Sequence, residues 1–199
     1  MHAYLTGLAT GLSLIVAIGA QNAFVLKQGL LRQHVLAVCL FCATSDALLI
    51  ALGVSGMGKI AALAPWAMTA MKFGGAGFLI WYGARSFLAA SRGGEALKAR
   101  ANGGDAGLAV ILATIAMLTW ANPHVYLDTV FLLGAVSAKF ADKTAFATGA
   151  ITGSFVFFFA LGYGARLLAP VFARPRAWQV LEIVIGCVMW AITAKLLLG

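Results

Sequence analysis

The sequence predicts an all-α membrane protein with about six transmembrane helices, arranged as two inverted repeats of three helices. Three observations support this prediction: the composition, the length of the apolar stretches, and a similarity between the two halves of the chain. Of the 199 residues, 62% are hydrophobic and only 10% are charged, whereas a soluble domain carries about 25% charged residues. The apolar residues also fall in long runs, so lipid is the expected environment of most of the chain.

Six stretches are long enough to cross the hydrocarbon core, which takes about 20 residues at about 1.5 Å per residue. In chain order they are Tyr4–Leu26, Val35–Met57, Phe73–Ala90, Leu108–Leu133, Thr144–Leu168 and Trp178–Leu198. No cluster of positive charge precedes the first stretch, and two residues with amide side chains, Gln21 and Asn22, lie near the end of this stretch. We therefore expect a retained helix there and not a cleaved signal peptide.

The basic residues predict the orientation of these helices. Nine of the 14 Lys and Arg residues lie around the first, third and fifth connections. Because basic connections stay in the cytoplasm, both termini are expected to face outward. The net charge of +8 is thus explained by orientation, and no nucleic-acid partner is expected. Residues 91–106, with four glycines and mixed charges, are predicted to be a cytoplasmic linker between a first three-helix repeat, 1–90, and a second, 107–199.

The two halves of the chain resemble each other. Ala20–Leu26 aligns with Ala121–Leu127, and Ser45 aligns with Ser154. A third match pairs a glycine and a tryptophan four residues later in the third and sixth stretches. With three helices in each half, the second copy crosses the membrane in the opposite sense, which is an arrangement that many secondary transporters share.

Each copy carries a helix-interrupting residue beside side-chain amides. Gly19 precedes Gln21 and Asn22, and Pro123 follows Asn122. Proline lacks an N–H and clashes with the preceding turn, so the fourth helix is expected to kink or break there. Matching interruptions predict where unwound backbone and amides line a substrate cavity. The alternative is that Pro123 only bends a helix and that the amides form hydrogen bonds between helices.

Two carboxylates are expected inside the membrane. Asp46 lies in the middle of the second stretch beside Ser45, and Asp128 follows His124 by four residues, so those two share a helical face. A carboxylate at mid-membrane costs roughly 2.5–3.5 kcal/mol, so each needs a partner or a function. The candidate functions are binding a cationic substrate, carrying a proton, or both. A neighbouring hydroxyl or lysine would satisfy them without any function, and a lone histidine is more often a core residue than a proton relay.

The remaining ionisable residues predict less chemistry. Glu182 is expected to pair with Arg174 or Arg176 on the cytoplasmic side. Cys39 and Cys42 have CxxC spacing, but on one apolar helix they are expected to be packing residues. No cluster of Cys, His and carboxylates has structural-metal spacing, so neither a metal nor another cofactor is expected.

Two alternatives to a transporter of this kind follow from the residues. Gly53-Val54-Ser55-Gly56 matches the short GxSG pattern of intramembrane serine proteases, although four small residues recur often by chance. A passive membrane scaffold is the other alternative, but it would not need the buried Asp46.

Three segments, Ile18–Gly29, Cys42–Gly53 and Asn122–Val130, resemble signatures of the lysine and arginine exporter (LysE/ArgO) family. With the chain length and the pattern of helices, the resemblance covers essentially the whole sequence. Related threonine and homoserine exporters carry a Pro-Gly-Pro-Asn type sequence where this chain has Gly-Ala-Gln-Asn, and they lack the acidic residue that Asp128 supplies.

The resemblance implies a multi-pass protein of the bacterial inner membrane that exports L-arginine, L-lysine or both and is not an enzyme. Export would be energised by the membrane potential, a proton gradient or both. Asp46 and Asp128 suit the cationic groups of such a substrate, and N–H groups at the helix interruptions suit its carboxylate. Export of another amino acid or small solute stays an alternative, and the sequence leaves a homodimer open.

Overall fold

The computed structural model describes residues 1–16, 19–56, 65–92, 107–172 and 174–198, and every regular element in these ranges is a helix. Three of the described helices, α3 (Val35–Val54), α10 (Lys143–Phe172) and α11 (Pro175–Leu198), are long and apolar enough to cross a bilayer. A fourth long helix, α5 (Pro65–Ser91), has 27 residues, a length of about 40 Å. The prediction of an all-helical membrane protein is confirmed, while residues 93–106 of the predicted linker lie outside the described ranges.

The first predicted span, Tyr4–Leu26, is interrupted at Gly19, as its sequence predicts. The chain forms α1 (His2–Ile15) and α2 (Ala20–Leu31), whose axes differ by 83°. Gly19 has extended backbone (φ −119°, ψ 171°) directly before α2, so the helical hydrogen-bond ladder cannot pass through it. The two helices together form one bent pair that is apolar enough to be a fourth membrane span.

The fourth predicted span also breaks, at the position that Pro123 predicts. α7 (Leu108–Trp120) ends two residues before the short helix α8 (Pro123–Val125), which continues as the π-helical segment η1 (Tyr126–Leu132) and α9 (Leu133–Ser137). The proline begins the new helix because a first-turn residue needs no intrahelical N–H donor. The expected break is confirmed, and the π-helical turns lie directly after it.

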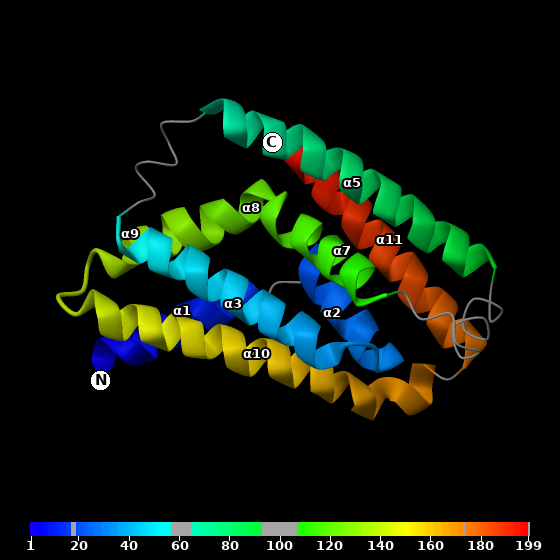
Figure 1. The fold of residues 1–199 in the computed structure, drawn as a ribbon, viewed down its shortest axis with the longest axis horizontal. Helices are drawn as coiled ribbons and strands as arrows, with labels where there is room; N and C mark the ends of the chain where they lie inside the picture. Colours follow the sequence, from blue (N-terminus) through cyan, green and yellow to red (C-terminus); the bar gives the residue numbers. More distant parts are fainter. Residues whose placement is uncertain (17–18, 57–64, 93–106, 173, 199) are drawn as a thin grey trace.

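Two helices of the broken spans, α2 and α7, lie between two groups of helices (Figure 1). On one side α5 packs against α11, and on the other α10 packs against α1 and α3. α2 contacts α3, α10 and α11, and α7 contacts α2, α3 and α5. α2 and α7, which flank the two breaks, therefore pack against several other helices, and irregular backbone at membrane depth is tolerated where it is buried in protein.

Glycines set the close packing of α1 on α10. A Cβ added to Gly7 would collide with the backbone carbonyl of Phe146, and one added to Gly149 would collide with that of Tyr4. Each glycine begins a Gly-x-x-x-Gly pattern, which lets helix backbones approach closely. The two patterns face one another and hold α1 against α10.

Among the described residues, the bundle has an apolar core that also holds several polar side chains, and it exposes many large apolar side chains. Leu36, Leu40 and Leu48 of α3 are exposed and recur at multiples of four, so they form one outward stripe. Asp46 lies on the opposite, buried face of α3. The buried polar or charged residues are Lys27, Gln28, Ser45, Asp46, Ser86, Thr119, Ser137, Ser154, Glu182 and Thr193. Lipid on the outside accounts for both observations.

The two cysteines of α3 belong to this packed interior. Cys39 and Cys42 are both free and buried, and the Cys39 thiol donates a hydrogen bond to the carbonyl oxygen of Phe158 at 3.2 Å. Their contribution is to the packing of α3 against α10.

Candidate functional site

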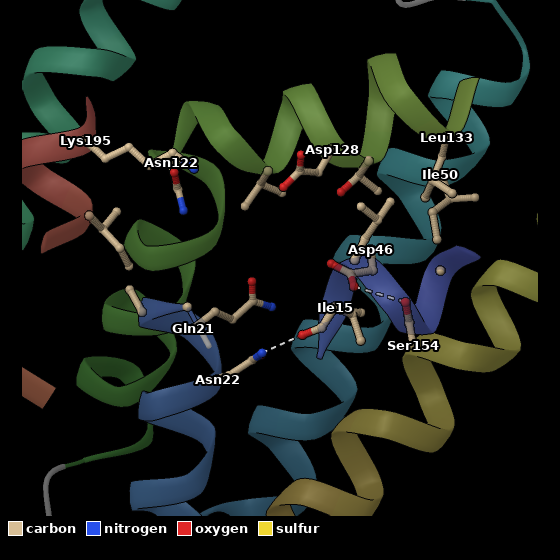
Figure 2. A pocket seen from close by; sticks show the side chains of 17 residues that line it. Ile15, Gln21, Asn22, Asp46, Ile50, Asn122, Asp128, Leu133, Ser154 and Lys195 are labelled. Carbon is tan, nitrogen blue, oxygen red and sulfur yellow. Dashed lines mark hydrogen bonds between the residues drawn. The ribbon is translucent and has the colours of Figure 1, made fainter. Parts of the chain in front are cut away.

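A cavity of about 220 Å³ lies where the two helix breaks meet (Figure 2). Its walls come from α1, α2, α3, η1, α10 and α11 and from residues at the two interruptions. The polar side chains that line it are Gln21, Asn22, Asp46, Asn122, Asp128, Thr129, Ser154 and Lys195. Apolar side chains such as Ile15, Ile50 and Leu133 line the rest.

The first break places the amino end of α2 at the cavity. Gly19, Ala20, Gln21 and Asn22 all line it, and the first N–H groups of a helix have no intrahelical acceptor. The side-chain amide of Asn22 donates to the carbonyl oxygen of Ile15 at 2.6 Å, which closes the end of α1. The amide nitrogen of Gln21 is buried and has no hydrogen-bond partner among the described residues.

The second break is bridged in the same manner. The hydroxyl of Tyr126 donates to the carbonyl oxygen of Trp120, the last residue of α7, at 2.9 Å. In both breaks, therefore, a side chain that follows the break donates a hydrogen bond to a carbonyl at the end of the helix before it. These bonds stabilise both interruptions. From this break Asn122, Asp128 and Thr129 reach the cavity.

Asp46 is the buried acidic group of the cavity. Its side chain comes from the inner face of α3, the residue is only 5% exposed, and its Oδ2 accepts a hydrogen bond from Ser154 of α10 at 3.0 Å (Figure 2). No lysine or arginine of the described ranges forms an ion pair with it. The hydroxyl beside Asp46 thus comes from another helix, because Thr44 of α3 donates to the carbonyl oxygen of Leu40.

The structure brings five of the eight sequence-predicted site residues to the cavity: Gln21, Asn22, Asp46, Asn122 and Asp128. Ser45 and Pro123 are buried outside its lining, and Ser45 accepts a hydrogen bond from the Trp120 indole at 3.2 Å. The side chain of His124 lies outside the described part of the structure.

Sequence reasoning missed three polar residues of the lining. Ser154 was detectable, because the repeat aligns it with Ser45. Thr129 and Lys195 carried no comparable signal, since Lys195 is simply one of the basic residues near a helix end.

A second buried charge lies away from the cavity and corrects the expectation for Glu182. Lys27 Nζ lies 2.6 Å from Glu182 Oε1 and 2.9 Å from Oε2, and the two side chains are only 7% and 1% exposed. The ammonium also lies 5.9 Å from the centroid of the Tyr82 ring. The expected partners Arg174 and Arg176 are wrong, because both are exposed at the start of α11.

The sequence model of the LysE type translocator family matches residues 12–199. The chain belongs to this family. Arginine exporter proteins ArgO from Escherichia coli (strain K12) and Klebsiella pneumoniae (strain 342) are each 40% identical to it over 195 residues, which cover 97% of this chain and 92% of each relative. No solved structure matches the chain.

Membership of the LysE family makes this chain a transporter of the inner membrane and not an enzyme. The serine of the GxSG pattern lies at the end of α3. Ser55 follows the last residue of α3, is exposed, and donates to the carbonyl of Leu52 at 2.9 Å. Within the described ranges, no three His, Cys, Asp or Glu side chains gather as a metal site would require.

Proposed function

We propose that this LysE-family protein is a secondary active exporter of L-arginine, L-lysine or both across the cytoplasmic membrane. The observation that carries the proposal is the buried, unpaired carboxyl group of Asp46 in a cavity between two helix breaks. The 40% identity to arginine exporter proteins supports the same class of cargo.

Asp46 is suited to hold the cationic side chain of the substrate. An ionised carboxylate at membrane depth is costly unless it is paired, and one hydrogen bond from Ser154 only partly offsets that cost. An entering guanidinium or ammonium supplies the missing charge. Asp128 offers a second carboxylate in the same lining, nearer the protein surface, for the substrate's other cationic group.

The amino end of α2 is suited to the α-carboxylate. The macrodipole places partial positive charge at a helix amino terminus, where N–H groups without intrahelical partners point along the axis. Gly19 and Ala20 bring this end to the cavity wall. Asn122 contributes an amide from the second break.

The transport cycle we propose uses the inverted repeat. Six membrane crossings, with α1–α2 and α7–α9 as equivalent broken spans, form two three-helix halves joined by a cytoplasmic segment at 91–106. The similar bridging of the two breaks by Asn22 and Tyr126 supports this equivalence. Because the membrane potential is negative inside, it opposes the outward movement of a cationic substrate by itself. In the proposed cycle, export is therefore coupled to protons that enter the cell, and Asp46 exchanges a proton.

Reconstitution in liposomes tests the proposal. Vesicles are loaded with labelled arginine, lysine or threonine, and release is measured with and without a membrane potential and a pH gradient. We expect selective release of arginine or lysine, accelerated by the gradients and lost in Asp46→Asn. Release of threonine at an equal rate would indicate a broader cargo class, and no release of any of the three from folded protein would overturn the proposal.

A further inference from the structure

Lys195 is a cavity residue for which the proposed function has so far given no task. It lies in the last turn of α11, and it lines the cavity together with Ile192, three residues earlier. Residues three apart share a helical face, so this face of α11 is turned toward the cavity and not only toward lipid.

The ionisable groups of the lining are complementary to those of a basic amino acid: equal in number and opposite in sign. The lining holds two carboxyl groups, Asp46 and Asp128, and one ammonium group, Lys195. Arginine and lysine each carry two cationic groups and one carboxylate near neutral pH. A neutral amino acid has one cationic group fewer, and an amine without a carboxylate would leave Lys195 facing only other positive charges.

The placement of the three groups also suits such a ligand. In Figure 2 Lys195 lies on the same side of the cavity as Asn122, Asp46 and Ser154 lie on the other side, and Asp128 lies between. The α-carboxylate and the side-chain cation of a basic amino acid are likewise at opposite ends of the molecule. The charges of the lining and those of such a ligand are therefore distributed in the same order, with opposite signs facing each other.

We propose that Lys195 binds the α-carboxylate of the exported amino acid and so makes the cavity select amino acids over amines that have the same side chain. The inference rests on the proposed function and adds a specificity-determining residue to it. An ammonium–carboxylate contact strengthens the hydrogen bonds that the amino end of α2 and Asn122 offer to the same group.

A purely structural role for Lys195 makes a different prediction. A lysine in the last turn of a helix interacts favourably with the helix dipole, and its charged end can reach the membrane surface. In that case replacement would affect stability, or the transport of every cargo, to the same extent. Selectivity between an amino acid and its decarboxylated analogue separates the two roles.

Competition in the liposome assay provides the test. Release of labelled arginine is measured against unlabelled arginine and against agmatine, which is arginine without its carboxylate, for the wild type, Lys195→Met and Lys195→Arg. We expect the wild type to favour arginine strongly over agmatine. In Lys195→Met the KM for arginine rises by about tenfold or more, inhibition by agmatine is unchanged or stronger, and Lys195→Arg retains the selectivity.

A lysine outside the cavity lining provides the matched control. Lys143 is exposed at the start of α10, and Lys143→Met is expected to leave the preference for arginine unchanged. Equal weakening of arginine and agmatine by Lys195→Met would overturn the inference and leave the proposed function standing. Equal recognition of arginine and agmatine by the wild type would also overturn it, even if every Lys195 variant failed to fold. A wild type that releases neither arginine nor lysine would overturn the proposed function, and the inference with it.

Discussion

Asp46 and Glu182 are both buried acidic residues of a helix bundle, yet their surroundings differ in every respect that matters for function. Glu182 is 1% exposed and contacts Lys27 through both carboxylate oxygens, at 2.6 and 2.9 Å. Asp46 is 5% exposed, accepts one hydrogen bond from a serine, and lines a cavity that Glu182 does not reach. The compensated charge joins two helices, whereas Asp46 faces a cavity, where we propose that it binds the substrate.

The difference shows that burial alone does not identify a functional acid. Both residues pay a desolvation cost, and both come from apolar helices, so composition and position in the span do not separate them. The two acids differ in whether a basic side chain of the fold supplies a counter-charge: Lys27 does so for Glu182, whereas Asp46 faces a cavity. The variants below test this difference, beginning with the largest expected effect.

Removal of Lys27 should have the largest effect on stability. Lys27→Met leaves Glu182 buried without a counter-charge, which lowers the free energy of unfolding by about 3–5 kcal/mol. Thermal unfolding of the purified protein in detergent measures the loss. The double variant Lys27→Met/Glu182→Leu should recover most of it, because an apolar pair of similar volume replaces a buried ion pair at little cost. Equal stability of the single and double variants would show that the ion pair is not compensating a buried charge.

Neutralisation of Asp46 should reverse this pattern. Asp46→Asn keeps a polar side chain beside Ser154 but removes the charge that awaits a cation, so the thermal stability should be unchanged or higher. Export should fall by at least about tenfold, since a hydrogen bond to a charged group contributes about 1.5–3 kcal/mol. Melting curves and liposome release on the same preparation measure the two quantities together. A destabilised but fully active variant would place Asp46 in the same class as Glu182.

Loss of the hydroxyl beside Asp46 should have the smallest effect. Ser154→Ala removes the hydrogen bond to Asp46 Oδ2, which is worth about 1 kcal/mol, so the apparent affinity for the exported amino acid should change by about fivefold. Ser45→Ala is the matched control, because Ser45 contacts Trp120 and not the cavity. Substrate titrations in liposomes compare the two, and identical titration curves would show that Ser154 does not influence the site.

The breaks of the fold could be predicted because they depend on local backbone chemistry. Pro123 cannot continue the hydrogen-bond ladder of α7, and Gly19 adopts the extended backbone that separates α1 from α2. The residues beside these breaks, Gln21, Asn22 and Asn122, were predicted for the same reason and line the cavity. A helix break can be predicted from the sequence because the residue that causes it lies at the break itself.

The partners of the charged residues could not be predicted, because they depend on how distant segments pack. The 83° turn between α1 and α2 directs Lys27 into the bundle, although the sequence places it in a connection between two apolar stretches. Glu182 is then satisfied by a residue 155 positions away and not by the arginines next to it. Lys195 escaped notice for the same reason, since only the packing of α11 places it at the cavity.

The Lys27–Glu182 ion pair has a consequence for how the protein is made. Lys27 leaves the ribosome 155 residues before its partner, and a buried charge is strongly destabilising while it lacks its counter-charge. Until α11 is in place, the packing of α2 in the bundle core therefore lacks the ion pair with Glu182 and is expected to be less stable. The same helix supplies Gln21 and Asn22 to the cavity wall, so the substrate site can take its final shape only at the end of synthesis, when the second half of the chain arrives.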